Sequence, residues 1–376
     1  MHDASHTAHS VSSPEDMRAK LPEMTWQDPF HLTEMLTEDE RMIADTAEAF
    51  CQEQLLPQVV EANRHEIFNR DIVSQMGDLG LLGVTLPEDL GGAGMDAMAL
   101  AVAIEAVAAA SGSLAWVLAV HNALALGHAL QVGDATLAAS LTSGKAIGAF
   151  AALPEVWATS SEDGWHLAGR GEGVTLDPVR GVLVLVASTA EGPTAFRVDA
   201  RSLKFQRART LGIAAASVGS VELDGPGLLV GAVGQAGPVV EAVQRAAAPV
   251  FAALSVGLGQ GALDAALRYA TERQQFGRPI ADFQAVQWML ADAGTELEAA
   301  RLLSRRAAAS GDAADGLAAR ILAADAGLAA ADRAIQIHGG AGYTTDYPVE
   351  RAWRDAQRLL VGVDAARVVL GQLSCA

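Results

Sequence analysis

The sequence predicts an α+β fold that is mainly α, with a small β domain between two helical blocks. Three blocks along the 376 residues, each with its own pattern of apolar residues, predict this fold. Apolar residues recur at helical spacing in residues 25–144, short runs rich in β-branched residues fill residues 145–232, and an alanine-rich helical pattern fills residues 233–376. Residues 1–24 are polar and mixed in charge, so we expect a disordered lead-in there and no signal peptide.

The first helical block opens with a capping-box pattern. Thr37 is followed at the third helical position by Glu40, so the hydroxyl and the carboxylate can each accept a free backbone N–H at a helix start. Met42, Ile43 and Phe50 then fall at helical spacing. The sequence therefore predicts an amphipathic helix that begins just after Thr37.

One stretch of this block has to be weighed against a membrane span. Residues 106–133 contain no Asp, Glu, Lys or Arg, and they exceed the ~18 residues that a span needs. The stretch also holds His121, Asn122 and His128, a polar break at Ser111–Ser113, and neither an aromatic belt nor a basic flank. We therefore expect two buried helices joined near Ser111–Ser113, and no membrane partner.

The middle and last blocks differ in period. Residues 181–187 form a short apolar run, and residues 218–223 alternate between apolar and polar side chains, as buried and half-buried strands do. The pair Asp224-Gly225 is a turn signal. From about residue 239 onward, long apolar stripes among alanines predict a buried helical bundle with subunit contacts.

Composition excludes several classes of protein. Hydrophobic residues make up 51% of the chain, which excludes a disordered or fibrous protein. The chain has 26 basic and 45 acidic side chains and a formal net charge of −19, which argues against a nucleic-acid partner. Its two cysteines, Cys51 and Cys375, lack the spacing of a disulfide or metal framework, so we expect no metal and a reduced, cytoplasmic setting.

Two stretches of the last block carry a specific resemblance. Residues 268–280 read RYATERQQFGRPI, and residues 335–343 read IQIHGGAGY and run on to the Arg-Asp-Ala of residues 354–356. In order and separation they resemble the acyl-CoA dehydrogenase family, and the TWQDP of residues 25–29 is similar to its glutaryl-CoA dehydrogenase branch. The resemblance covers about residues 25–373 and is weakest in the middle.

The resemblance implies an acyl-CoA dehydrogenase-like architecture. Its parts are an N-terminal helical domain at residues 25–144, a shortened central β domain at residues 145–232, and a C-terminal four-helix bundle at residues 233–376. It also implies FAD as cofactor and an acyl thioester of coenzyme A or of a carrier protein as substrate. The expected assembly is a homo- or hetero-oligomer, a tetramer built as a dimer of dimers.

Five residues match the family's flavin-binding motifs. The resemblance implies that Arg273, Phe276, Gln336, Gly339 and Gly340 bind the adenine dinucleotide of FAD across a subunit interface. A guanidinium can bind a diphosphate through paired hydrogen bonds, and a glycine pair lets the backbone approach a bulky ligand. Spacing alone is explained more simply without a ligand: Arg273 would be solvated, Phe276 would lie in the core, and the glycine pair would form a turn at a helix end. The resemblance reverses that preference.

The family's proton-abstracting glutamate is missing. The resemblance implies that a carboxylate removes the α-proton of the acyl group while hydride passes from the β-carbon to the flavin. This glutamate normally precedes a glycine shortly after the Arg-Asp-Ala motif. If that glycine is Gly362, Val361 stands in the place of the base, and an ungapped count puts Val363 there. Neither side chain can accept a proton.

One carboxylate lies near the empty position. Some family members carry the base on an earlier helix, where this chain has Ala247, followed by Ala248 in place of the usual arginine. Near the usual position Asp364 is one residue out of register in the ungapped count, and its side chain is a methylene shorter than glutamate. Asp364 is therefore the candidate catalytic base, although an aspartate that caps the last helix explains it more simply.

The central domain and one substrate position also depart from the family pattern. The loop between Pro154 and Trp165 is short and lacks the usual Gly-Ser-Asp. Residues 171–176 stand where a Trp-Ile-Thr segment would lie against the flavin ring, and only Thr175 matches. Near the carboxylate-binding arginine of the glutaryl branch this chain has Leu114, a substrate-binding position that implies no dicarboxylic substrate.

Three functions follow from these departures. The preferred one is a partner subunit of a flavin-dependent acyl thioester α,β-dehydrogenase, which completes the flavin site of an active neighbour without supplying a base. The second is a stand-alone FAD-dependent dehydrogenase of fatty acid metabolism that uses Asp364 as an unusual base. The third is a homologue that performs different chemistry on an acyl thioester, such as elimination of a β-substituent, for which no α-base is required.

Overall fold

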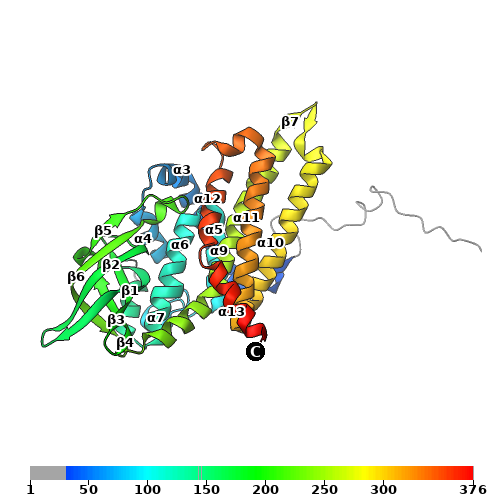
Figure 1. The fold of residues 1–376 in the computed structure, drawn as a ribbon. Helices are drawn as coiled ribbons and strands as arrows, with labels where there is room; N and C mark the ends of the chain where they lie inside the picture. Colours follow the sequence, from blue (N-terminus) through cyan, green and yellow to red (C-terminus); the bar gives the residue numbers. More distant parts are fainter. Residues whose placement is uncertain (1–30, 143, 145, 376) are drawn as a thin grey trace, which may run out of the picture.

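The computed structural model describes residues 31–142, 144 and 146–375, with side chains as far as residue 370. The predicted lead-in and residues 25–29 lie outside the described residues. N-terminal helices, a small sheet and long C-terminal helices follow one another along the chain, as the sequence predicts (Figure 1). The fold is mainly helical, with a central β domain.

The N-terminal block consists of short helices and two π-helical segments. They are α2 (Glu38–Phe50), η2 (Cys51–Leu55), α3 (Leu56–Arg64), α4 (Arg70–Asp78), α5 (Ala97–Ala110), α6 (Gly112–Ala119), η4 (Val120–Leu126), α7 (Gly127–Gln131) and α8 (Ala135–Thr142). The predicted capping box is confirmed at α2. The Glu40 N–H donates to the Thr37 hydroxyl at 3.3 Å, and the Thr37 N–H donates to the Glu40 carboxylate at 2.7 Å.

The helix joint at Ser111 is also confirmed. Ser111 has an extended backbone between α5 and α6, and its hydroxyl accepts the Leu114 N–H at 3.4 Å. Residues Gly112–Gln131 and Ala236–Glu272 are long and apolar enough to cross a membrane by length and composition alone. In this fold 72% and 78% of their most apolar windows are buried, because both segments form the core of the helical packing.

Six strands form the central sheet. They are β1 (Ile147–Ser161), β2 (Gly164–Thr175), β3 (Gly181–Thr189), β4 (Gly192–Asp199), β5 (Lys204–Arg207) and β6 (Val218–Val230). Their order is β2-β1-β3-β4-β6-β5, and a further pairing of β2 with β6 closes the sheet on itself. Among the described strands, β1 and β3 pair in parallel and the other pairs are antiparallel. Phe196, Leu167 and Leu183 are fully buried inside the sheet.

The turn expected at Asp224-Gly225 is wrong. Both residues lie inside β6, where Asp224 pairs with Ala168 and Gly225 with Leu167 of β2. The local turn signal is overridden because β6 extends along β2 for most of its length, and this pairing satisfies the backbone hydrogen bonds that a turn would leave free.

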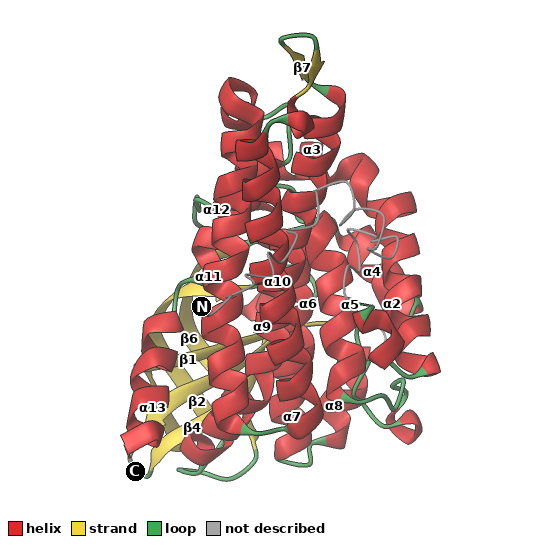
Figure 2. Ribbon diagram, turned by 90° about the vertical axis from the view of Figure 1, so that its right-hand side faces the viewer, coloured by secondary structure: helices red, strands yellow, loops and turns green. Residues whose placement is uncertain are grey.

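The C-terminal block is a bundle of long helices. Its elements are α9 (Ala236–Glu272), β7 (Gln274–Gln275), β8 (Arg278–Pro279), α10 (Gln284–Ser310), α11 (Ala313–His338), α12 (Val349–Leu359) and α13 (Val363–Cys375). The helices α9, α10 and α11 run side by side, and α12 and α13 pack one after the other along α11 (Figure 2). Glycines let α9 approach α5 closely: a Cβ at Gly257 would lie 2.2 Å from the Glu105 carbonyl oxygen.

Candidate functional site

One end of the C-terminal bundle gathers the residues predicted to hold the dinucleotide. The helix α9 ends at Glu272 and α11 ends at His338, and the β7–β8 hairpin projects beyond them (Figures 1 and 2). Arg273 follows α9 directly and lines a cavity of about 340 Å³ together with His338 and Tyr347. The two helix ends and the loop before α12 therefore share one surface.

Three aromatic rings pack against one another on this surface. The Tyr269 ring stacks on the His338 imidazole with centroids 4.2 Å apart and planes at 22°. The Tyr347 ring meets the Tyr269 ring edge-on at 5.4 Å. The His338 Nδ1 donates to the Ala334 carbonyl at 2.8 Å, and burial lowers the pKa of His338, so burial favours the neutral imidazole in the stack. The stack fixes the end of α9 against the end of α11.

The predicted ligand-binding side chains on this surface are exposed. Neither Arg273 nor Gln336 makes a side-chain hydrogen bond or ion pair with any residue that the structure describes. Gly339 has a φ of 57°, and a Cβ built at Gly339 or at Gly340 meets nothing within 4 Å. The backbone at the end of α11 is therefore open to a ligand that comes from outside the chain.

Phe276 lies at the tip of the β7–β8 hairpin and does not join the core. Its side chain is 93% exposed, with a φ of 52°. The Phe283 ring approaches it edge-on at 6.2 Å, and the Arg278 guanidinium lies 4.3 Å from the Phe283 centroid. A large aromatic ring held in the open is typical of a contact surface rather than of a core position.

This surface fits one side of an adenine dinucleotide site. Arg273 offers a free guanidinium for a diphosphate, Gln336 offers an amide, and Gly339 and Gly340 offer backbone without a Cβ. The surface is open on its outer side, so a dinucleotide lying on it would need a second chain to cover it.

The two positions counted for the missing base carry no proton acceptor, and they lie in different surroundings. Val361 is 61% exposed, whereas Val363 is buried at the start of α13. Gly362 between them has a φ of 88°, which lets the chain turn from α12 into α13. At the alternative position, Ala247 is buried inside α9.

Asp364 lies in the first turn of α13 and points to solvent. Its side chain is 93% exposed and accepts a hydrogen bond from the Arg367 guanidinium at 3.0 Å. Arg367 also pairs with Asp325 of α11 at 2.7 Å. The structure therefore places Asp364 in a surface ion-pair network that links α13 to α11. The network accounts for the residue without a catalytic role.

Where β2, α6, α9, α11 and α12 meet, aromatic and arginine side chains lie between Thr175 and the end of α12. The Trp116 indole N–H donates to the Thr175 hydroxyl at 2.8 Å, and its ring lies 5.4 Å from the Phe251 ring. The Arg358 guanidinium lies 5.3 Å from the Trp116 centroid, and Arg320 lies 5.2 Å from the Phe251 centroid. We call Trp116, Phe251, Arg320 and Arg358 the aromatic–arginine cluster.

The two arginines of this cluster have no acidic partner among the residues that the structure describes. Burial lowers the pKa of both Arg320 and Arg358, and the Arg358 Nε has no hydrogen-bond partner. Sequence reasoning missed Trp116, Arg320 and Arg358, since they come from three separate helices. The only local hint was Arg358 itself, a few residues before the missing glutamate.

Leu114 packs into the hydrophobic core at the start of α6. It lines a hollow of only about 20 Å³ with Val59, Ser111 and Ala215. A leucine in this setting offers apolar surface and no charge to a ligand. The placement does not test the predicted role of Leu114 in substrate choice.

Comparisons with known proteins agree with the motifs. Residues 37–142 match the family profile described as acyl-CoA dehydrogenase, N-terminal domain, and residues 242–362 match the profile of the C-terminal domain. The mitochondrial short-chain specific acyl-CoA dehydrogenase of Mus musculus is 31% identical over 353 residues, which cover 86% of each chain. The 3-sulfinopropanoyl-CoA desulfinase of Paraburkholderia xenovorans (strain LB400) is 31% identical over 376 residues, covering 90% of this chain and 96% of that protein.

Solved structures have the same fold. A glutaryl-coenzyme A dehydrogenase in complex with glutaryl-CoA superimposes with a TM-score of 0.85 at 28% identity, covering 91% of this chain and 96% of that one. The butyryl-CoA dehydrogenase of Megasphaera elsdenii gives a TM-score of 0.87 at 24% identity, covering 91% of this chain and 99% of that one, and this likeness shows the fold alone. The chain belongs to the acyl-CoA dehydrogenase family, and the relatives that it matches include acyl-CoA dehydrogenases.

Proposed function

We propose that the chain is a partner subunit of a flavin-dependent acyl thioester α,β-dehydrogenase. It contributes one side of the FAD dinucleotide site through Arg273, Phe276, Gln336, Gly339 and Gly340, and it supplies no proton-abstracting base. The bound FAD supplies the acceptor for hydride in this chemistry. The assembly is a dimer of dimers with an active neighbour in the cytoplasm, and its substrate is an acyl thioester of coenzyme A or of a carrier protein.

The observation that carries the proposal is the contrast between the dinucleotide surface and the positions counted for the base. The dinucleotide surface keeps a free guanidinium at Arg273 and open backbone at Gly339. The positions counted for the base hold Val361, Val363 and Ala247 instead of a carboxylate. Loss of a positioned base costs about 10²–10⁴ in rate, so a chain without one is nearly silent at this step. A surface kept for a ligand beside a region without a base fits a subunit that assists a neighbour.

The aromatic–arginine cluster beside Thr175 adds to this argument. Trp116 and Phe251 form part of one hydrophobic cluster with α9 and α12 residues, and Arg358 covers the Trp116 ring. The hydroxyl of Thr175, the residue expected against the flavin ring, accepts a hydrogen bond from the Trp116 indole N–H. An acyl chain would have to displace large aromatic groups in order to lie beside Thr175.

Flavin content tests the proposal. The chain would be purified alone and after co-expression with a family member that carries the glutamate, and flavin per chain would be measured from the visible spectrum. We expect little flavin in the chain alone and stoichiometric flavin in the complex. Replacing Arg273 by alanine should lower the flavin content of the complex, whereas Arg245→Ala, an exposed arginine elsewhere on α9, should not. Full flavin in the chain alone would contradict the proposal.

A second candidate function is supported by one comparison. The desulfinase of Paraburkholderia xenovorans aligns with this chain over 96% of its length. Replacement of a β-sulfinate by hydrogen leaves the α-proton in place: the C–S bond breaks, the β-carbon keeps the electron pair and takes a proton, and water converts the released SO₂ to sulfite, so no α-base is required. Arg320 and Arg358 are half-buried and have no acidic partner in the described chain, which suits an anionic β-substituent. Release of sulfite from 3-sulfinopropanoyl-CoA by the chain alone would support this function over the partner subunit.

A further inference from the structure

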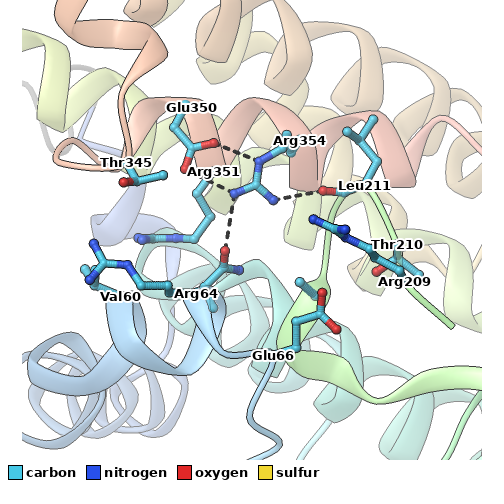
Figure 3. Close-up of a pocket in the computed structure, with 12 residues that line it drawn as sticks. Val60, Arg64, Glu66, Arg209, Thr210, Leu211, Thr345, Glu350, Arg351 and Arg354 are labelled. Carbon is cyan, nitrogen blue, oxygen red and sulfur yellow. Dashed lines mark hydrogen bonds and ion pairs between the residues drawn. The ribbon is translucent and has the colours of Figure 1, made fainter. Parts of the chain in front are cut away.

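A cavity of about 550 Å³ lies between α3, the loop that precedes β6, and the start of α12 (Figure 3). We call it the arginine pocket, because Arg64, Arg209, Arg351 and Arg354 all line it. It shares no lining residue with the cavity beside Arg273. Cavities of this size are typical of small-molecule sites, about 300–1,000 Å³.

One of the four arginines is fully engaged. The Arg354 Nε donates to the Glu350 carboxylate at 2.7 Å, and its Nη1 donates to the Leu211 carbonyl at 2.8 Å. Its Nη2 reaches the Asn63 side-chain oxygen at 3.3 Å (Figure 3). Glu350 is therefore neutralised by Arg354 and cannot balance the other guanidiniums of the pocket.

The remaining guanidiniums are mostly uncompensated. Arg209 and Arg351 make no hydrogen bond or ion pair with any residue in the described part of the chain. Arg64 pairs only with Glu61, one turn earlier on the exposed side of α3. Burial lowers the pKa of Arg351 even though Asp355 and Glu350 lie near. A buried guanidinium without a partner is costly, so an anion in the pocket would relieve that cost.

The balance of charge indicates the class of ligand. Besides the neutralised Glu350, Glu66 is the other carboxylate that lines the pocket. Arg354 is balanced by Glu350 and Arg64 by Glu61, and Glu66 lies near Arg207, which leaves an excess of two guanidiniums, Arg209 and Arg351, without an ion pair in the described chain. A dianion matches this excess better than a monocarboxylate does. Planar guanidinium forks also match phosphate oxygens in pairs.

Backbone strain borders the same pocket. Glu66 and Ile213 have φ angles of 54° and 48°, in the left-handed region that non-glycine residues seldom adopt. Glu66 lines the pocket, and Ile213 immediately precedes its lining residue Ala214. Strained residues of this kind gather at sites where the surrounding structure positions groups for a ligand.

We propose that the arginine pocket binds the phosphate or diphosphate group of a small molecule, at a site separate from the dinucleotide surface. Arg209 and Arg351 are the direct contacts, and Arg354 is held in place by Glu350. The group can belong to free inorganic pyrophosphate or to a nucleoside diphosphate, and the two sources present the same chemistry to the guanidiniums.

Calorimetric titration of the full chain tests the proposal. Pyrophosphate, ADP and adenosine would each be titrated at low and at high salt. We expect pyrophosphate and ADP to bind, adenosine not to bind, and binding to weaken as salt screens the charges. Tighter binding of ADP than of pyrophosphate would identify a nucleotide as the source, and the reverse order would identify the inorganic ion. Absence of binding by both anions at millimolar concentration would overturn the proposal.

Variants separate this pocket from general charge effects. Arg209→Ala removes an exposed side chain without a described partner, so the variant should fold and bind pyrophosphate about 10-fold or more weakly, as loss of a charged hydrogen bond predicts. Arg351→Gln should weaken binding similarly. Arg245→Ala, an exposed arginine on α9, should leave the affinity unchanged. Equal affinity in the wild-type protein, Arg209→Ala and Arg351→Gln would refute the assignment.

Discussion

At the scale of single residues, the clearest departure from an ordinary member of the family is the absence of a positioned carboxylate. Val361 and Val363 differ sharply in exposure, 61% against 1%, so the chain passes the base position by turning at Gly362. Asp364 follows on the outer side of that turn, paired with Arg367. Its geometry is that of a surface aspartate near the positive end of a helix.

Asp364→Ala should therefore leave flavin reduction by an acyl-CoA unchanged in the complex of this chain with its neighbour. An exposed ion-pair member contributes little, whereas removal of a working base would slow the step about 10²–10⁴-fold. Stopped-flow measurement of flavin bleaching would check this. Asp325→Ala is the matched control, since it removes the other carboxylate of Arg367. A large loss of rate with Asp364→Ala alone would restore the unusual-base hypothesis.

A second residue-scale feature is the buried histidine of α7. His128 lies near Phe150 with ring centroids 5.8 Å apart, and neither of its ring nitrogens has a hydrogen-bond partner in the described structure. Burial lowers the pKa of His128 from 6.5 to about 4. The folded state therefore holds the neutral ring, while the unfolded chain takes up a proton below about pH 6.5.

The contribution of His128 to stability should fall as the pH is lowered from 6.5 to about 4, because at this residue only the unfolded state gains a proton in that window. His128→Leu should remove roughly 1–3 kcal/mol of this fall and should not destabilise the protein at pH 7. Urea unfolding of both proteins at several pH values gives the comparison. Buried Asp355, whose pKa is raised to about 6, acts in the opposite direction but equally in both proteins. Parallel pH profiles would show that His128 is not the group responsible.

At the scale of elements, α9 is the helix around which the other parts pack. It contacts α5, α10, α11 and α12, and its glycines allow the close approach to α5. A Cβ at Gly261 would lie 2.2 Å from the Ala109 carbonyl oxygen, as at Gly257 with Glu105. Gly237, in the first turn of the same helix, has nothing within 4 Å of the same built atom.

Gly257→Ala should destabilise the protein by about 1–3 kcal/mol, because the added methyl group forces α9 away from α5. Gly237→Ala should be neutral or stabilising by up to about 1 kcal/mol, since alanine is the better helix former and the space is open. Urea unfolding midpoints of the two variants would give the difference. Equal effects would mean that the α5–α9 contact is looser than described.

Elements that depend on neighbouring residues could be predicted from the sequence, and those that depend on distant ones could not. The capping box at Thr37 and the joint at Ser111 are set within a few residues, and both are present. The turn expected at Asp224 was lost to pairing with a strand more than fifty residues away. The motif residues lie at the ends of α9 and α11, because each motif falls within one short stretch, and their role in binding a dinucleotide stays a prediction.

The junction and the arginine pocket could not be predicted in the same way. The indole of Trp116 reaches Thr175 on another domain, and Arg354 reaches Asn63 across 291 positions of sequence. No local pattern pairs such residues, because only the packing of α3, α6 and α12 brings them together. For the same reason the sequence did not predict that half-buried Arg320 and Arg358 would lie without an acidic partner in the described chain.

At the scale of the whole molecule, the chain presents an open bundle end and a centre that holds the aromatic–arginine cluster. The bundle end carries Arg273, the exposed Phe276 ring and bare backbone at Gly339, without cover from the described chain. The aromatic–arginine cluster lies at the centre, where the β domain meets α6, α9 and α12.

The most direct test uses the complex of this chain with a family member that carries the catalytic glutamate. That glutamate would be replaced by glutamine in the neighbour, with this chain unchanged, and flavin bleaching by an acyl-CoA would be followed without oxygen. If this chain supplies no base, the bleaching of all the flavin should slow by about 10²–10⁴-fold, while the flavin content stays full. Bleaching that persists for about half of the flavin would contradict the account, because this chain would then carry a working base of its own.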